Sequence, residues 1–456
     1  MTAGLDAAAA VVRGAGLGAP LLAVVVLCAW RPPGPRVVAA AITSTAWAAL
    51  LLLALHHAAV ERGWWTYHAT GAVWRGLPVD LWLGWSLLWG AVPALCLAAA
   101  RHDRVDRGAS CRQVAVVLAG LVVLDLVLMP YGAPVVVLGS AWLVGEVVGV
   151  LTALVPAVLL ARWTLRRTRV TARAWAQAVW AGGLLVGLPV LAVSPVPPWP
   201  AAVTSAGLQL ALVACLPGLA AMRELAVVGR GTPLPYDPPA RLVTSGPYAY
   251  VRNPMQLTVA ATFAVLAPVL GEPELLVGVL VAVAYSVGIA DWHEGEGLRR
   301  AFGRAWTEYR AAVRPWVPRL RPAPVVAPAT LWVAADCEPC TGVALWFARR
   351  RPVGLTIRPA AEHPEVLWRV TYELTAEASP PPGSRDVRPL LRTQGVSAVA
   401  RALAHVHLGW ALAGWALDLP GVRHLAQLGA DAFGAEPRPS RPVPTSCPAP
   451  RLTMNT

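Results

Sequence analysis

The stretch GTPLPYDPPARLVTSGPYAYVRNPMQ, residues Gly231–Gln256, is a polar loop rich in Pro and Gly between strongly apolar segments. A second polar segment, HEGEGLRRAFGRAWTEYRAAVRPWVPR, runs from His293 to Arg319. Only an apolar helical hairpin separates the two, so chain connectivity predicts that they lie close together on one membrane face. Because its prolines restrict the backbone, the loop holds its polar groups in fixed directions at a low entropic cost. We therefore expect the two segments to form a cofactor site.

The side chains of these segments suit a ligand that carries charges of both signs. Tyr248 and Tyr250 offer aromatic faces, Arg252 a fork of donors, and Asn253 both a donor and an acceptor. The second segment adds Glu294 and Glu296 where the last apolar run ends, followed by Tyr309 and Arg314. An Arg beside carboxylates and aromatic rings matches a ligand with a carboxylate, an ammonium group and a flat base.

The composition indicates a polytopic membrane protein. Of 456 residues, 56% are hydrophobic, and the mean hydropathy is +0.54. Several runs are long enough to cross a bilayer as helices. We expect an all-α bundle of about nine transmembrane helices, with runs at roughly 14–30, 37–60, 81–100, 113–129, 135–161, 174–193, 199–228, 257–270 and 275–290.

The net charge of +13 reflects membrane topology more than nucleic-acid binding, because the basic residues fall in short loops between apolar runs. One set of alternate loops holds fourteen arginines and the opposite set three. The positive-inside rule makes the arginine-rich set cytoplasmic, with the N-terminus outside and everything after Asp291 inside. The basic residues are all Arg, which favours a bacterial source and the plasma membrane and leaves no lysine for Schiff-base chemistry.

Asp125 and Glu146 are acids inside apolar runs, which makes them functional candidates. At about 1.5 Å per residue, the run boundaries place Asp125 near the outer surface and Glu146 near mid-membrane. We therefore expect no contact between the two carboxyl groups, and we favour a structural role for each. The tryptophans between residues 64 and 89 are interpreted as an interfacial belt and as packing, not as a binding cage.

A soluble segment follows the membrane part. Residues 321–330, RPAPVVAPAT, are predicted to be an extended linker. Strands are expected at 331–336, 354–358 and 367–373, and helices at 341–350 and 396–405, with a disordered tail at 435–456. Cys337 and Cys340 come directly after a strand and open a helix, where the helix dipole lowers the pKa of a thiol. A redox-active dithiol, an inert remnant and a metal site all remain open, and no metal site is predicted outright.

The two polar segments resemble the isoprenylcysteine carboxyl methyltransferase and phospholipid methyltransferase superfamily over about residues 199–320. The first motif is GPYAYVRNP, residues 246–254. The second is a spaced pattern, which matches at Glu294, Leu298, Phe302, Gly303, Tyr309, Val313 and Pro318.

The resemblance implies an integral membrane enzyme that transfers a methyl group from S-adenosylmethionine to a lipophilic carboxylate or amine. It implies that Tyr248, Tyr250, Tyr309, Arg252, Asn253, Pro254 and Glu294 bind the cofactor, and that Arg252, Glu294 and Glu296 are catalytic. Asn253 stands where the family has a His, and the family's Glu-Glu pair reads Glu294-Gly295-Glu296 here. Gln256 stands where a Tyr is common. These departures leave the acceptor open.

Residues 331–434 resemble the DCC thiol-disulfide oxidoreductase family, which implies a small cytoplasmic α/β domain of the thioredoxin type. We expect five parts: a bundle of about six helices at 1–198, a methyltransferase-like core at 199–320, the linker, the thioredoxin-like domain and the tail. The alternative function is a membrane-anchored thiol-disulfide oxidoreductase that uses Cys337 and Cys340 with a thiol redox partner. The expected partners otherwise are the bilayer and a lipophilic or lipidated acceptor, not nucleic acid.

Overall fold

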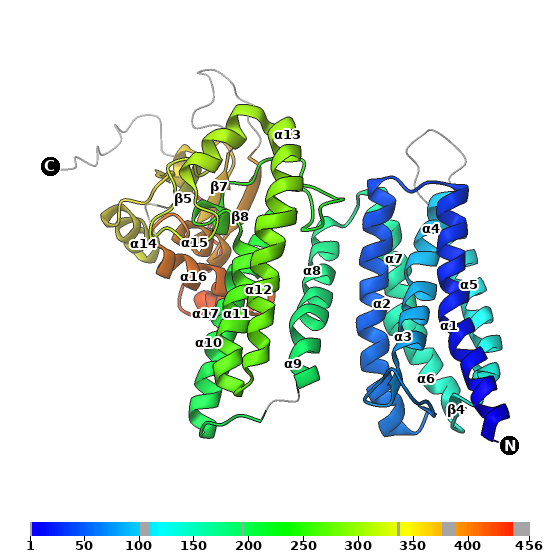
Figure 1. The fold of residues 1–456 in the computed structure, drawn as a ribbon. Coiled ribbons are helices and arrows are strands. Elements are labelled where there is room, and N and C mark those ends of the chain that lie inside the picture. The colour runs from blue at the N-terminus through cyan, green and yellow to red at the C-terminus, as the bar shows by residue number, and fades with distance from the viewer. Residues whose placement is uncertain (1, 101–109, 194–195, 335–337, 376–388, 441–456) are drawn as a thin grey trace, which may run out of the picture. The chain divides into compact units, whose positions relative to one another are not determined.

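A computed structural model describes residues 2–100, 110–193, 196–334, 338–375 and 389–440 (Figure 1). The chain divides into two compact units. The first contains residues 1–194 and 230–239, and the second contains residues 195–229 and 240–456. The loop from Gly231 to Gln256 is therefore shared, since its first part belongs to one unit and its second part to the other.

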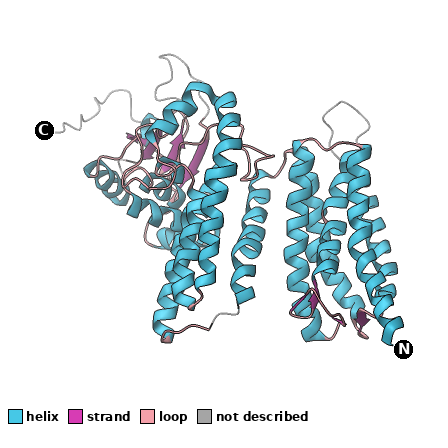
Figure 2. Cartoon of the chain, in the orientation of Figure 1, coloured by secondary structure: helices cyan, strands magenta, loops and turns pink. Residues whose placement is uncertain are grey.

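The first unit is a bundle of long helices (Figures 1 and 2). Two of the apolar helical segments contain a short stretch of π-helix, at residues 150–154 and at residues 182–187. The helices are α1 Thr2–Trp30, α2 Pro35–Arg62, α3 Val79–Trp89, α4 Ala91–Ala99, α5 Cys111–Leu128, α6 Trp142–Gly149, α7 Val155–Arg166, α8 Val170–Ala181 and α9 Leu188–Val193.

Local sequence explains where these helices begin and end. Pro35 occupies the first turn of α2, where its missing N–H costs nothing, and Gly63 ends α2 with a φ of 62°. At the start of α5, the Ser110 hydroxyl accepts from the Gln113 backbone while the Gln113 side chain accepts from the Ser110 backbone. This reciprocal cap satisfies two N–H groups that the helix itself leaves unpaired.

Small residues let the helices of the bundle approach closely. A Cβ on Gly84 of α3 would lie 2.0 Å from the carbonyl oxygen of Gly16 in α1. A Cβ on Gly90, between α3 and α4, would lie 2.3 Å from the Cα of Thr45 in α2. The Ser44 hydroxyl also donates to the Gly90 carbonyl at 2.9 Å. Backbone approach of this kind is how helices associate in a bilayer, where apolar surface alone provides little driving force.

Short strands gather at one end of the bundle, where magenta segments lie beyond the helices in Figure 2. Two antiparallel pairs form there, one within the loop that joins α2 to α3 and one that joins this loop to the segment after α5. The strands are β1 Trp65–Tyr67, β2 Val73–Trp74, β3 Leu77–Pro78 and β4 Val136–Leu138, with Trp65 opposite Leu138.

Seven helices in the described ranges are long and apolar enough to cross a membrane. Two further segments, Pro254–Leu270 and Pro273–Gly288, are apolar but shorter. Each of the nine predicted runs is mainly helical in the described ranges, although the run 135–161 begins with strand β4, and only seven helices meet the length of a span. The mainly helical, multi-pass character predicted from composition is confirmed, whereas the count of nine is not.

The second unit begins with helices that pack side by side in Figure 1. These are α10 Ala201–Val227, α11 Pro254–Leu270, α12 Leu276–Ala284 and α13 Asp291–Ala312, with a wider turn at 285–290 between α12 and α13. Helix α13 bends sharply at Gly303, whose φ of 51° and ψ of −122° are not helical. Only glycine adopts such a conformation at a low cost.

A four-stranded sheet follows in the same unit, in the order β6-β5-β7-β8. Strand β5 pairs parallel with β6 and antiparallel with β7, and β7 pairs antiparallel with β8. Three of the strands and two of the helices were predicted near their observed positions. The elements are β5 Ala329–Val333, α14 Glu338–Arg349, β6 Leu355–Pro359, β7 Thr371–Leu374, β8 Leu391–Gln394, α15 Val396–Leu403, α16 Leu408–Leu417 and α17 Pro420–Ala432.

Parts of the predicted linker and of the first residues of the predicted tail contact the rest of the second unit. Ala323 and Val326 of the expected linker are buried, and the Ala323 N–H donates to the Ala249 carbonyl at 2.8 Å. At the start of the expected tail, the Ser440 N–H donates to the Leu367 carbonyl at 2.7 Å. Pro-rich and polar composition lowers the ability to form a core, but it does not prevent a segment from covering one. Residues 441–456 lie outside the described part.

Candidate functional site

The two polar segments meet through their backbones, as the sequence predicts. The Arg252 N–H donates to the Arg314 carbonyl at 2.9 Å, and the Asn253 N–H donates to the Pro315 carbonyl at 3.3 Å. The Arg319 N–H donates back to the Tyr250 carbonyl at 3.0 Å. These bonds hold the GPYAYVRNP motif in register with the chain that follows α13.

Tyr248 and Tyr309 form the core of this contact. The Tyr309 hydroxyl donates to the Tyr248 carbonyl at 3.0 Å, and both rings are buried beside Trp306 and Val243. Burial raises the pKa of the Tyr309 phenol, so the group remains a hydrogen-bond donor at neutral pH. The predicted cofactor-binding role of these two residues remains a prediction, and their visible role is packing.

Tyr250 is directed into the C-terminal part of the second unit. Its hydroxyl donates to the Ala404 carbonyl at 2.8 Å, and its ring meets Trp415 edge-on. The side chain is 1% exposed, and burial raises the pKa of its phenol. Its polar atom is therefore already paired within the protein, which leaves the ring as the only part that could contact a ligand.

Arg252, Asn253 and Pro254 lie together at the start of α11. Pro254 occupies the first turn of this helix and is buried, while Arg252 and Asn253 are half-buried. The Asn253 amide donates to the Ser286 hydroxyl at 3.0 Å. Ser286 is buried in the segment between α12 and α13 and was not selected from the sequence, because a single Ser in an apolar run carries no distinctive signal.

The acidic residues of α13 have different surroundings. The side chain of Glu294 lies outside the described atoms. Glu296 forms ion pairs with Arg299 and Arg300 on the same helix, and the hydrogen bond from Arg299 lowers the pKa of its carboxyl group. Pairs three and four positions apart on an exposed helix face arrange charges along that face.

The bend at Gly303 returns the second half of α13 toward its first half. As a result, the Arg310 guanidinium lies near buried Gly295, where an added Cβ would be 3.8 Å from Arg310 Nη1. The Arg252 charge also acts on the Tyr309 phenol. One cationic group, Arg310, therefore lies near the glycine between Glu294 and Glu296, and Arg252 of the other polar segment lies near Tyr309.

A buried network of ion pairs, which was not predicted, contacts the loop at Ser245. Glu224 of α10 accepts from the Ser245 hydroxyl and from Arg401 Nη1, the latter at 3.0 Å. Asp418 pairs with Arg223 and, at 3.5 Å, with Arg401. The only sequence signal was the Arg223-Glu224 dipeptide near the end of an apolar helix. Its ion-pair partners, Asp418 and Arg401, lie more than 170 positions away along the chain.

Only one of the two predicted redox cysteines lies in the described part of the chain. Cys340 lies in the first turn of α14 and packs against the core beneath the sheet, which includes Phe347 and Leu331. Cys337 lies outside the described residues. The proposed dithiol therefore remains a prediction.

The comparison with protein families bears on the first part of this unit. A family model for phospholipid methyltransferases matches residues 203–305. The match spans α10, the GPYAYVRNP loop, α11, α12 and the first half of α13, and it ends before Tyr309. It supports a membrane methyltransferase and leaves the acceptor open. No curated protein and no solved structure matches the chain.

Proposed function

We propose that residues 199–320 form an integral membrane methyltransferase that uses S-adenosylmethionine and acts on a lipophilic acceptor. The observation that carries this proposal is the backbone pairing of Arg252 and Asn253, which lie within the family match, with Arg314 and Pro315, which follow its end at residue 305. This pairing brings together two segments that each hold part of the expected site. Both were selected from the sequence for the same ligand chemistry.

The residues near this pairing fit the charges of the cofactor. Its carboxylate suits the guanidinium groups of Arg252 and Arg310, and its ammonium suits a carboxylate such as Glu294. Asn253 and backbone groups would orient its polar edge. When bound, S-adenosylmethionine supplies a methyl group on a positively charged sulfur, which a nucleophile attacks directly. The protein contributes chiefly by positioning, because two reactants held at near-attack distance react far faster than free ones.

The environment of Glu296 bears on the acceptor. A carboxylate acceptor needs no general base, whereas an ammonium acceptor must first lose a proton. Because Arg299 and Arg300 stabilise its charged form, Glu296 is a weakened base. We therefore assign Glu296 to charge arrangement on α13, and a proton from an amine acceptor would have to leave by another group.

We place the protein in the plasma membrane, and the arrangement of arginines in the sequence supports an orientation with the N-terminus outside and the C-terminal part in the cytoplasm. The site would then lie at the cytoplasmic face, where S-adenosylmethionine is available. The acceptor would enter from the bilayer.

We further propose that residues 329–432 have a thioredoxin-like fold. The support is the order β6-β5-β7-β8, with a parallel β5-α14-β6 unit followed by an antiparallel β7-β8 hairpin and a helix. The ion network and the Tyr250–Ala404 hydrogen bond suggest that this part supports the methyltransferase loop. The oxidoreductase alternative depends on Cys337, and replacing both cysteines by Ser separates the two functions, because methyl transfer should then continue.

The direct test is methyl transfer from radiolabelled S-adenosylmethionine in membranes that contain the full chain, followed by lipid extraction. We expect a labelled lipid product and cofactor binding in the wild type. Both should be lost in Arg252→Ala and Glu294→Ala. Arg241→Ala is the matched control, since Arg241 is an exposed arginine of the same loop. Unchanged cofactor binding in the two site variants would remove the site assignment.

A further inference from the structure

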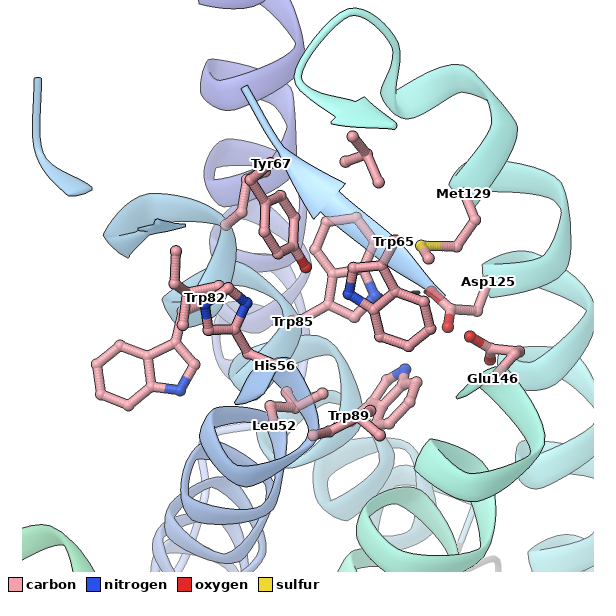
Figure 3. Close-up of a pocket in the computed structure, with 14 residues that line it drawn as sticks. Leu52, His56, Trp65, Tyr67, Trp82, Trp85, Trp89, Asp125, Met129 and Glu146 are labelled. Atoms are coloured by element: carbon pink, nitrogen blue, oxygen red, sulfur yellow. Dashed lines mark hydrogen bonds between the residues drawn. The ribbon is translucent and has the colours of Figure 1, made fainter. Parts of the chain in front are cut away.

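A second polar site lies in the first unit, within the bundle (Figure 3). A small, partly open cavity is lined by side chains from α2, α3, α5, α6 and the short strands. Four tryptophans belong to this lining, and Asp125 and Glu146 carry its only carboxyl groups. Figure 3 shows the two carboxyl groups facing each other, with the rings of Trp65, Trp85 and Trp89 beside them.

This arrangement corrects the prediction that the two acids do not meet. Their carboxyl groups are within hydrogen-bonding reach of each other. The predicted depth of Glu146 was wrong because residues 136–138 form strand β4, so helix α6 begins only at Trp142. Asp125 lies one turn from the end of α5, and Glu146 lies one turn from the start of α6. Both are thus near the same end of the bundle.

The tryptophan interpretation also changes. Trp65, Trp82, Trp85 and Trp89 all line the cavity. Trp85 Nε1 donates to Asp125 Oδ1 at 2.7 Å, and Trp82 Nε1 donates to the Ala49 carbonyl at 2.8 Å. Trp65, Trp85 and Trp89 lie beside the acids in Figure 3, and the interfacial belt stays a prediction.

Several polar atoms of the cavity lack a partner within the protein. Asp125 is 1% exposed and Glu146 is 4% exposed, yet Asp125 Oδ2 and Glu146 Oε1 receive no hydrogen bond from the described residues. The indole N–H of Trp89, itself 1% exposed, also has no acceptor there. Leaving a buried carboxylate oxygen unpaired costs at least about 1–3 kcal/mol, so these two oxygens are satisfied either by a proton that the two acids share or by a bound hydrogen-bond donor.

The chemistry of the lining narrows the class of that group. The cavity measures about 40 Å³, room for on the order of three water-sized groups. A hard metal cation prefers six or more oxygen ligands, whereas only Tyr67, Asp125 and Glu146 carry side-chain oxygens in this lining. Indole faces instead attract organic cations. The carboxylate oxygens accept hydrogen bonds from N–H or O–H groups, and a quaternary ammonium group has neither.

We propose that this cavity binds the ammonium group of a small alkylamine, with its N–H groups donating to Asp125 and Glu146 and its first carbons lying against the indole rings. The site lies in the first unit, apart from the residues assigned to methyl transfer. The proposal therefore does not depend on that activity.

The test is calorimetric titration of the full-length protein in detergent with n-butylamine. n-Butanol has the same chain without the charge, and n-butyltrimethylammonium has the charge without N–H donors. We expect saturable binding of n-butylamine and at least about tenfold weaker binding of the other two compounds. Equal binding of n-butanol or of the quaternary compound would overturn the proposal, and this comparison needs no variant.

Variants then locate the site. Glu146→Gln and Asp125→Asn should each weaken n-butylamine binding at least about tenfold, because each removes one buried charge that the ammonium group contacts. Glu61→Gln should bind like the wild type, since Glu61 is an exposed acid near the end of α2 in the same unit. Unchanged binding in both site variants would overturn the assignment. Saturable sodium binding that is lost in Glu146→Gln would also overturn it, in favour of an inorganic cation.

Discussion

The hydroxyl group of Tyr250 donates a hydrogen bond to the carbonyl oxygen of Ala404 at 2.8 Å, across 154 positions of the chain. Tyr250 belongs to the GPYAYVRNP motif, and Ala404 directly follows α15 in the C-terminal part. The edge-on contact of its ring with Trp415 and the donation from the Leu408 N–H to the Leu320 carbonyl at 2.9 Å lie in the same contact. The C-terminal part is therefore packed against the back of the proposed methyltransferase loop.

Tyr250→Phe should destabilise this contact. The substitution leaves the ring in place but removes the donor to a buried carbonyl, which costs about 1–3 kcal/mol. We expect a lower melting temperature and weaker S-adenosylmethionine binding, measured on the full-length protein in detergent. Tyr236→Phe is the matched control, because Tyr236 is exposed. A melting temperature equal to that of the control would show that the hydrogen bond contributes nothing.

Glu224→Gln should be more disruptive than its position in an apolar helix suggests. It leaves the buried Arg401 guanidinium without its closest carboxylate, and breaking one partner of a buried pair costs about 3–5 kcal/mol. We expect a large drop in the melting temperature, partly restored when Arg401 is replaced by Met in the same chain. Additive effects of the two substitutions would contradict a direct interaction.

Gly303→Ala should oppose the bend of α13. An added Cβ has no neighbour within 4 Å, so the cost is backbone strain at φ 51° and is about 1–3 kcal/mol. We expect weaker cofactor binding, because Arg310 would move away from Gly295. Gly297→Ala is the control, as its Cβ is also unobstructed but no positive φ is involved. The control should bind the cofactor normally, and equal behaviour of the two variants would argue against a role for the bend.

His405 should make stability depend on pH. Its Nδ1 lies 2.8 Å from the Val353 carbonyl and its Nε2 lies 2.9 Å from the Tyr372 hydroxyl, which fits a neutral ring that donates to Val353 and accepts from Tyr372. Burial lowers the pKa of His405 from 6.5 to about 4. Because the unfolded chain then binds the proton more tightly, this contribution is present above pH 6.5 and is lost as the pH falls toward 4.

The loss of folding stability from protonation of His405 amounts to about 3 kcal/mol, at 1.36 kcal/mol for each pKa unit. We expect His405→Gln to flatten the pH dependence of the melting temperature between these limits. His424→Gln should leave it unchanged, since His424 is exposed. An unaltered slope in His405→Gln would assign the pH dependence to other groups.

Much of the helical framework was predictable, because long apolar runs allow few structures other than a membrane helix. Boundaries were less predictable. The run 135–161 contains both strand β4 and helix α6, and both are apolar, so hydropathy alone could not separate them. That error of a few residues moved Glu146 by more than one turn and hid its contact with Asp125.

The directions of the Tyr248 and Tyr250 side chains were not predictable from the motif. GPYAYVRNP indicates that Tyr248 and Tyr250 lie in one loop, but a sequence motif does not show which way each side chain points. In the structure both are buried, and Tyr250 is paired with a residue of the C-terminal part. Such a partner is selected by packing between distant segments, which no local pattern records.

The sequence by itself determined the membrane character, the arginine asymmetry and the two polar segments, because each depends on local composition and on chain connectivity. Tertiary structure alone decided that Glu224 meets Arg401, that Asp125 faces Glu146 and that four tryptophans line one cavity. The physical reason is the same in each case. A buried polar group must find a partner wherever the fold provides one, and the distance along the chain does not limit that choice.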